Sequence, residues 1–142
     1  MRGEFVIEHV SQETKLQYER IVGEVRETLR LAGIPLTDRK GNSGAHVYID
    51  TFLNAGSEGG SEGVYVEWLS SAELMAKVDD CAERSDFENP VLPFADAVLD
   101  AVRTMLRDVL EGAGWRASLD DVGVHEEGVR VFGRSGPAPG LD

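Results

Sequence analysis

Two short stretches decide the fold of this chain: His46–Leu53, which reads HVYIDTFL, and Val64–Leu69, which reads VYVEWL. Both are rich in β-branched and aromatic residues, and the side chains of a strand point alternately to its two faces. Buried faces fix the register of paired strands, so the aliphatic residues of the first strand should lie beside Val64, Val66 and Trp68. The sequence therefore predicts a β-hairpin with one apolar face toward the core.

The same alternation gathers polar and aromatic side chains on the opposite, outer face of this hairpin. That face is expected to display six candidate binding residues: His46, Tyr48, Asp50, Phe52, Tyr65 and Glu67. The segment between the strands, residues 54–63, contains Gly-Ser-Glu-Gly twice in succession and is expected to form the tip of the hairpin.

A long helix is expected before the hairpin. Ser11 can cap its start, and apolar residues then recur at helical spacing as far as Ala32. Gly33 supplies a left-handed residue, Ile34 can pack back on the helix, and Pro35 prevents continuation. These residues predict that the helix ends in a Schellman motif.

Two further helices are expected after the hairpin. The first follows the capping box formed by Ser70 and Glu73, and the second has Pro93 in its first turn and stops at Gly112. The buried stripe of the second is predicted to comprise Phe94, Val98, Val102, Met105, Leu106 and Val109, whereas Asp96, Asp100, Arg103, Arg107 and Glu111 should face water.

Strands are also expected over residues 5–10, 115–119 and 129–132, which completes the order strand, helix, strand, strand, helix, helix, strand, strand. This order predicts an α+β two-layer sandwich of an antiparallel or mixed sheet with about three helices, and a ferredoxin-like arrangement is the alternative topology. The 142 residues fit one domain, expected over residues 1–133. Residues 134–142, rich in Gly and Pro, are expected to form a disordered tail.

The net charge of the chain argues against two classes of partner, nucleic acids and anionic membranes. Fourteen Lys and Arg against 26 Asp and Glu give a net charge of −12, which repels a nucleic-acid backbone and an anionic membrane. The sequence has no catalytic, nucleotide-binding or metal-binding motif, so no cofactor and no metal are expected. The single cysteine, Cys81, is interpreted as a core residue, and the protein is expected to be cytoplasmic.

The outer face of the hairpin admits three interpretations. Its polar and aromatic pairs could simply stabilise the sheet, or they could form a protein-binding surface toward which the negative charge steers a basic partner. They could also form a small catalytic or metal site. His46 and Asp50, four residues apart on one strand, would lie about 13 Å apart, too far to share one ion. His125, with Glu126 and Glu127, is interpreted as part of an exposed turn that ends at Gly128, although it could reach this face if its loop folded over the sheet.

We therefore expect a non-enzymatic protein-binding module of the inhibitor, immunity or chaperone-adaptor kind, which engages a more basic partner through the outer face of the hairpin. The alternative is a small-molecule-binding domain or small enzyme with a polar and aromatic pocket around Tyr48, His46, Asp50 and Glu67. The sequence leaves a homodimer open.

Overall fold

The computed structural model describes residues 8–38, 42–53, 61–119, 125 and 127–139. Its helices are α1 (Gln12–Leu31), α2 (Ala72–Glu83) and α3 (Val91–Gly112). Its strands are β1 (Glu8–His9), β2 (Gly44–Asp50), β3 (Phe52–Leu53), β4 (Gly63–Leu69), β5 (Trp115–Ser118) and β6 (Val129–Arg134). The predictions made for residues 5–7 and 54–60 lie outside the described residues.

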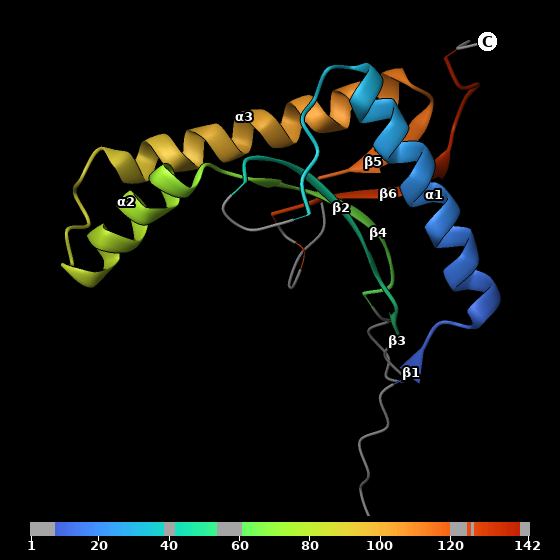
Figure 1. Ribbon diagram of the computed structural model, residues 1–142, viewed down its shortest axis with the longest axis horizontal. Helices are drawn as coiled ribbons and strands as arrows, with labels where there is room; N and C mark the ends of the chain where they lie inside the picture. The colour runs from blue at the N-terminus through green and yellow to red at the C-terminus, as the bar shows by residue number, and fades with distance from the viewer. Residues whose placement is uncertain (1–7, 39–41, 54–60, 120–124, 126, 140–142) are drawn as a thin grey trace, which may run out of the picture.

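The strands form two antiparallel sheets. The main sheet has the order β2-β4-β6-β5, and the short strands β1 and β3 pair in a separate ribbon. Helices α1 and α3 lie along one face of the main sheet (Figure 1). The predicted α+β two-layer sandwich is confirmed, with a fully antiparallel sheet. A ferredoxin-like arrangement would place the first strand inside the main sheet, whereas β1 of this chain pairs with β3 in the separate ribbon.

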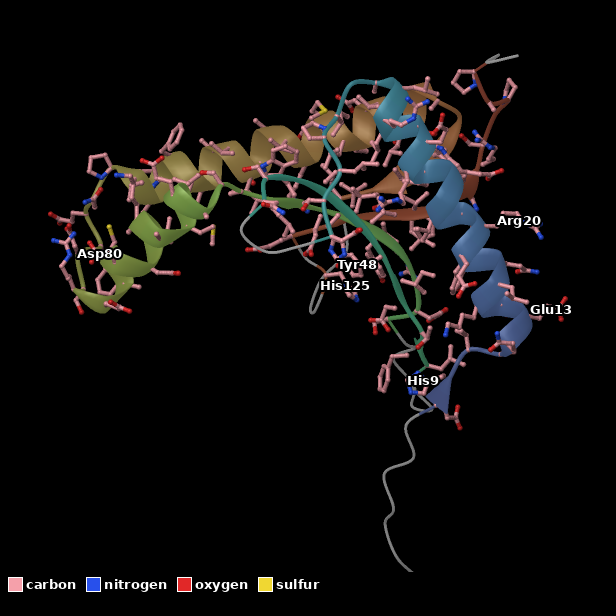
Figure 2. The ribbon with its side chains drawn as sticks, in the orientation of Figure 1. His9, Glu13, Arg20, Tyr48, Asp80 and His125 are labelled. Carbon is pink, nitrogen blue, oxygen red and sulfur yellow. The ribbon has the colours of Figure 1, made fainter. Side chains whose placement is uncertain are left out.

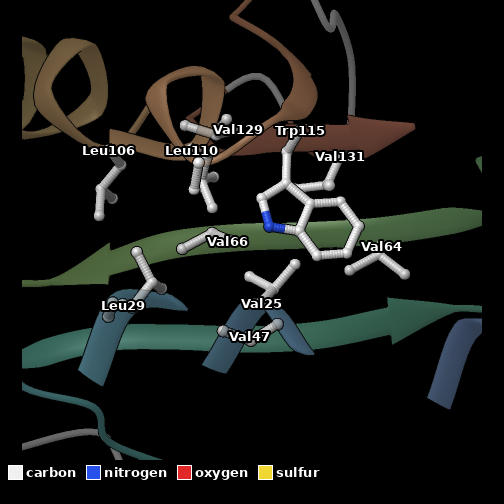
Figure 3. Close-up of a cluster of buried hydrophobic side chains, with 12 residues drawn as sticks. Val25, Leu29, Val47, Val64, Val66, Leu106, Leu110, Trp115, Val129 and Val131 are labelled. Carbon is white, nitrogen blue, oxygen red and sulfur yellow. The ribbon is translucent and has the colours of Figure 1, made fainter. Parts of the chain in front are cut away.

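The predicted register of the hairpin is confirmed. Val47 pairs with Val66, and Ile49 with Val64, so the aliphatic side chains of β2 and β4 share one face. Residues from α1, α3, β5 and β6 pack on that face (Figure 3). The buried cluster comprises Val25, Leu29, Ala45, Val47, Val64, Val66, Leu106, Leu110, Ala113, Trp115, Val129 and Val131.

One difference concerns the end of the first hairpin strand, which was predicted to continue to Leu53. Strand β2 ends at Asp50, and the chain then forms β3, in which Phe52 pairs with His9 of β1. The Val10 amide donates to the Thr51 carbonyl at 2.9 Å, which holds this ribbon together. Phe52 therefore belongs to the ribbon and lies beyond the last residue of β2.

Both ends of α1 agree with the sequence. The Ser11 hydroxyl accepts a hydrogen bond from the Thr14 amide at 3.2 Å. At the other end, the Ile34 amide donates to the Leu29 carbonyl and the Gly33 amide to the Arg30 carbonyl, each at 3.0 Å. Gly33 has a φ of 81°, so the Schellman motif is confirmed.

We expect Gly33→Ala to lower the free energy of unfolding by about 1 kcal/mol, because alanine adopts the left-handed conformation at a cost that glycine avoids. No atom lies within 4 Å of an added Cβ, so the effect should come from the backbone alone. Urea denaturation measures it. The matched control is Gly23→Ala, inside α1 and equally unobstructed, which should be stabilising by a similar amount. A loss at both positions, or at neither, would contradict this explanation.

Two predictions about the later helices were wrong in detail. The cap of α2 is Ser71, whose hydroxyl accepts from the Leu74 amide at 3.1 Å, and not Ser70. In α3, Phe94 and Met105 were predicted to be buried but are exposed. The apolar period is present, but burial also requires another element to cover the helix.

The first residues of the predicted tail, from Arg134 to Gly136, contact the rest of the domain. Arg134 is the last residue of β6, and the amides of Ser135 and Gly136 donate to the Gly114 carbonyl at 2.7 and 3.1 Å. Residues 134–139 of the predicted tail are thus described, whereas residues 140–142 lie outside the described part. None of the described helices has the length and apolar character needed to cross a bilayer.

Candidate functional site

Strand pairing brings four of the predicted site residues together on the outer face of the main sheet. His46 lies opposite Glu67, and Tyr48 lies opposite Tyr65, on the paired strands β2 and β4. Asp50 ends β2 on the same side, because strand side chains alternate. We call the residues His46, Tyr48, Asp50 and Glu67 the outer strip; all four are half-buried.

His46 and Glu67 form a cross-strand pair at the more open end of the outer strip. The Nδ1 atom of His46 lies 3.0 Å from Oε1 of Glu67, and their side chains are 28% and 37% exposed. The His46 ring also stacks on Tyr48, with 5.3 Å between ring centroids. The contact is an ion pair when the imidazole is protonated and a neutral hydrogen bond otherwise.

His125 is the main site residue that the sequence analysis placed wrongly. Its side chain is only 9% exposed, not part of an exposed turn, and it lies against the outer strip beside Tyr48 (Figure 2). Nδ1 lies 2.8 Å from the Tyr48 hydroxyl, and Nε2 lies 2.7 Å from Oδ2 of Asp50. The ring stacks on Tyr65 with 3.8 Å between centroids. A carboxylate only accepts, so Nε2 donates to Asp50 while Nδ1 can accept from the Tyr48 phenol.

Asp50 is the anionic end of this chain of hydrogen bonds. Burial by itself raises the pKa of its carboxyl group, but the hydrogen bonds from His125, the Phe52 amide and Ser61 outweigh it, together with the charge of His125. The net result is a pKa below the ordinary value of 3.8. The carboxylate is therefore held in its ionised form by its neighbours, among them the Phe52 amide at 2.7 Å.

We expect Asp50→Asn to lower the free energy of unfolding at pH 7, and to do so progressively less as the pH falls below about 4. A carboxyl group with a lowered pKa in the folded state binds fewer protons than in the unfolded state, so its contribution is present above the unfolded value and is lost in acid. Urea denaturation at several pH values measures the difference. The control is Asp79→Asn at an exposed position on α2. An Asp50→Asn effect that stayed constant from pH 7 to pH 3 would contradict the prediction.

Arg103 of α3 contacts the connection between β5 and β6, residues 119–128, of which the structure describes Leu119, His125, Glu127 and Gly128. Its Nη2 atom donates to the Leu119 carbonyl at 3.2 Å and lies 3.4 Å from the Gly128 carbonyl, near the two ends of that connection. The sequence analysis placed Arg103 on the solvated face of α3, but its Nε atom is buried, with no partner among the described residues. Periodicity gave no signal for this role, since a long arginine can reach across to backbone carbonyls.

Gly128 brings the same connection close to the sheet. A Cβ atom there would lie 3.3 Å from the Val66 carbonyl oxygen and 3.8 Å from the Tyr48 hydroxyl. The Gly128 amide also donates to the His125 carbonyl at 2.9 Å. A larger residue at this position would therefore need a shift of a few tenths of an ångström between Gly128 and the Val66 carbonyl.

Two of the six predicted site residues are not available on this face. Tyr65 is fully buried: the His125 ring covers it, and its hydroxyl donates to the Ser61 carbonyl at 2.9 Å. Phe52 belongs to β3, as described above. Tyr65 therefore lies under the His125 ring, and the outer strip holds the more exposed side chains of this face.

The hydrogen-bonding groups of this cluster are already paired with one another, and this pairing limits the chemistry that they can carry out on a substrate. Both nitrogens of His125 are engaged and its ring is almost buried, so the imidazole could accept a proton from a substrate only through the Tyr48 hydroxyl, or directly after Tyr48 moved away. Among the described residues, no group of three metal-ligating side chains converges. No protein-family model matches this chain, and no curated protein or solved structure does either.

Proposed function

We propose that this protein is a non-enzymatic binding module that engages a more basic protein through the outer strip. The observation that carries the proposal is a half-exposed row of acidic and aromatic side chains that are already fixed to one another. Helices α1 and α3 pack on the opposite face of the sheet, and on the outer face His125 contacts Tyr48 and Asp50 of the outer strip.

Internal hydrogen bonds make the outer strip a prepared surface. Tyr48 is held by His125, and Glu67 is held by His46. Ordering a mobile side chain at an interface costs about 0.5 to 1.5 kcal/mol, and much of this cost is already met within the free protein. A phenol and two carboxylates in fixed positions are suited to a partner that presents arginine or lysine.

The overall charge supports a basic partner. A net charge of −12 attracts a positively charged protein over distances comparable with the Debye length, about 8 Å at physiological salt. Such steering raises the association rate more than it changes the dissociation rate. An inhibitor, an immunity-type protein and a chaperone-type adaptor would each use this combination of charge and prepared surface.

We expect Glu67→Lys and Tyr48→Phe to test separately the charge and the phenol hydroxyl of the proposed surface. Charge reversal at Glu67 should weaken capture of the partner by about ten-fold or more, mainly through the association rate, with a reduced dependence on salt. Tyr48→Phe keeps the ring and removes the hydroxyl, so it should act mainly on the dissociation rate. Affinity purification identifies the partner, and surface plasmon resonance at two salt concentrations measures the rates.

The matched control for the charge reversal is Glu13→Lys, which makes the same change on the exposed first turn of α1. It should change the association rate much less than Glu67→Lys does. If both variants weaken binding equally, the net charge and not the outer strip determines recognition. If Glu67→Lys and Tyr48→Phe both fold and keep every captured partner, the proposed surface is wrong.

The hydrogen-bonded sequence Tyr48, His125, Asp50 favours a second candidate, a small enzyme or small-molecule-binding domain. In it, Asp50 would orient His125, which would accept a proton through Tyr48 from a bound substrate. Tyr48→Phe and His125→Gln should then abolish turnover, whereas His46→Gln should leave part of it. Hydrolysis of 4-nitrophenyl acetate, with His9→Gln as the control for unspecific imidazole reactivity, distinguishes this candidate from the binding module.

A further inference from the structure

Helix α2 and the first half of α3 form an arm that projects beyond the main sheet (Figure 1). We define the helical arm as residues 71–100. Helix α2 packs mainly on α3, and Cys81 is the one residue of the described arm that is fully buried. Asp80 on this arm lies well to one side of Tyr48 and His125 (Figure 2), so the arm is separate from the outer strip.

The helical arm exposes large apolar side chains. Phe87 in the connection between the two helices is 70% exposed, Phe94 in the first turn of α3 is 58% exposed, and Met75 on α2 is 45% exposed. Exposed aromatic residues at a projecting site, away from the core that could have buried them, are typical of an interaction surface.

The charge around these aromatic residues identifies the kind of partner. Eight acidic side chains and two basic ones leave the arm with a net charge of −6, half of the charge of the whole chain, in 30 of its 142 residues. One of the two basic residues, Arg84, is engaged within the arm, with Nη2 2.8 Å from Asp80 and 3.9 Å from Asp86. A second copy of this chain would bring −6 against −6, which disfavours a homodimer through the arm.

Two aromatic rings of the sheet, the exposed Phe132 and the buried Trp115, show which contact the arm lacks. On β6, Phe132 is also exposed, but the Arg130 guanidinium lies over its ring at 5.0 Å from the centroid. The Trp115 ring is covered in the same way by Arg134, at 4.1 Å. Among the described residues, no guanidinium lies over Phe87 or Phe94. A guanidinium over an aromatic face is attracted by the quadrupole of the ring, and more strongly when the contact is shielded from water.

We propose that the helical arm is a second binding surface, which takes an arginine-rich segment of a partner protein. Arginine side chains of that segment lie over Phe87 and Phe94, and exposed carboxylates close to Phe87 in the sequence, Glu83 and Glu88, pair with the guanidinium groups. This inference goes beyond the function proposed for the outer strip, because it rests on different residues and does not require the same partner.

A fluorescein-labelled peptide in which arginine alternates with alanine tests the proposal by fluorescence anisotropy at about 0.15 M salt. The aromatic variant Phe87→Ala with Phe94→Ala should weaken binding of this probe by about ten-fold. The charge variant Glu83→Gln with Glu88→Gln should weaken it by several-fold. Both pairs of side chains are exposed, so circular dichroism should show unchanged folding.

Matched controls make the same changes elsewhere. Phe132→Ala removes an exposed ring from β6, and Glu13→Gln with Glu19→Gln removes two exposed charges from α1. Each should change the affinity by less than about two-fold. Amide chemical shifts recorded during the titration should change between residues 79 and 96.

Three results would overturn the inference. The controls could weaken binding as much as the arm variants, which would indicate attraction to net charge alone. The shift changes could fall on β2 and β4, which would indicate that the probe binds the outer strip. Sedimentation velocity could detect a dimer that the aromatic variant dissociates, which would make the occupant a second copy. Glu67→Lys should leave probe binding unchanged, so failure here and failure of the outer strip are separable.

Discussion

Val66→Asp is expected to abolish folding of the domain. Val66 is fully buried in the middle of β4, where it pairs with Val47 of β2 and Val129 of β6. The cluster that surrounds its side chain is made of apolar residues, so a carboxylate there would lose its hydration. Burying it costs several kcal/mol, which is comparable with the whole stability of a domain of this size, about 5 to 15 kcal/mol. Near-ultraviolet circular dichroism and thermal denaturation should show the loss of fixed tertiary structure.

The adjacent residue provides the control for this experiment. Glu67 follows Val66 on the same strand but points to the outer face, where its side chain is 37% exposed. Glu67→Lys should therefore keep a cooperative unfolding transition close to that of the unmodified protein. A Val66→Asp variant that also unfolds cooperatively, within a few degrees of the unmodified protein, would show that the side chain can turn away from the core.

The parts of the fold that could be predicted from the sequence are those that depend on local pattern. Alternation along β2 and β4 assigned Val47, Ile49, Val64 and Val66 to one face, and the observed pairs follow from that assignment. Gly33 and its neighbours marked the end of α1 because the Schellman motif involves only adjacent residues. Both signals need no knowledge of the rest of the chain.

The candidate site could be predicted only in part, because its most connected residue comes from an irregular segment. His125 lies 77 residues after Tyr48 and 75 after Asp50, and nothing in its local sequence indicates that its side chain reaches them. Arg103 contacts the backbone carbonyls of Leu119 and Gly128, on either side of His125, and such contacts leave no periodic signal. Burial of Tyr65 under the His125 ring was missed for the same reason.

The helical arm shows a second limit of pattern analysis. Phe94 has the spacing of a buried residue on α3, and the helix does form with that spacing. Periodicity reports which face of a helix is apolar, but the length of the sheet decides how much of that face is covered. Helix α3 extends past the sheet, so its first turns leave apolar side chains exposed while Leu106 and Leu110 of its second half are buried (Figure 1).

Trp115→Ala is expected to lower the free energy of unfolding by about 3 to 5 kcal/mol. Trp115 begins β5 and is fully buried in the core cluster between the sheet and the helices. Its indole Nε1 donates to the Thr28 hydroxyl of α1 at 3.2 Å, and the Arg134 guanidinium of β6 covers its ring. One side chain thus joins an edge strand, the neighbouring strand and a helix, so its removal leaves a cavity and takes away one of the two hydrogen bonds of the Thr28 hydroxyl, which still donates to the Glu24 carbonyl at 3.0 Å.

Two further variants divide this effect. Trp115→Phe keeps most of the ring volume and loses the indole donor, so we expect a smaller loss, in which about 1 kcal/mol comes from the hydrogen bond. Thr28→Val removes the acceptor and leaves the ring in place, so the double variant should lose little more than Trp115→Phe alone. Urea denaturation of the four proteins closes this cycle. If Trp115→Ala costs less than about 1 kcal/mol, the helix and strands must close around the missing ring, and α1 is held on the sheet by its aliphatic contacts alone.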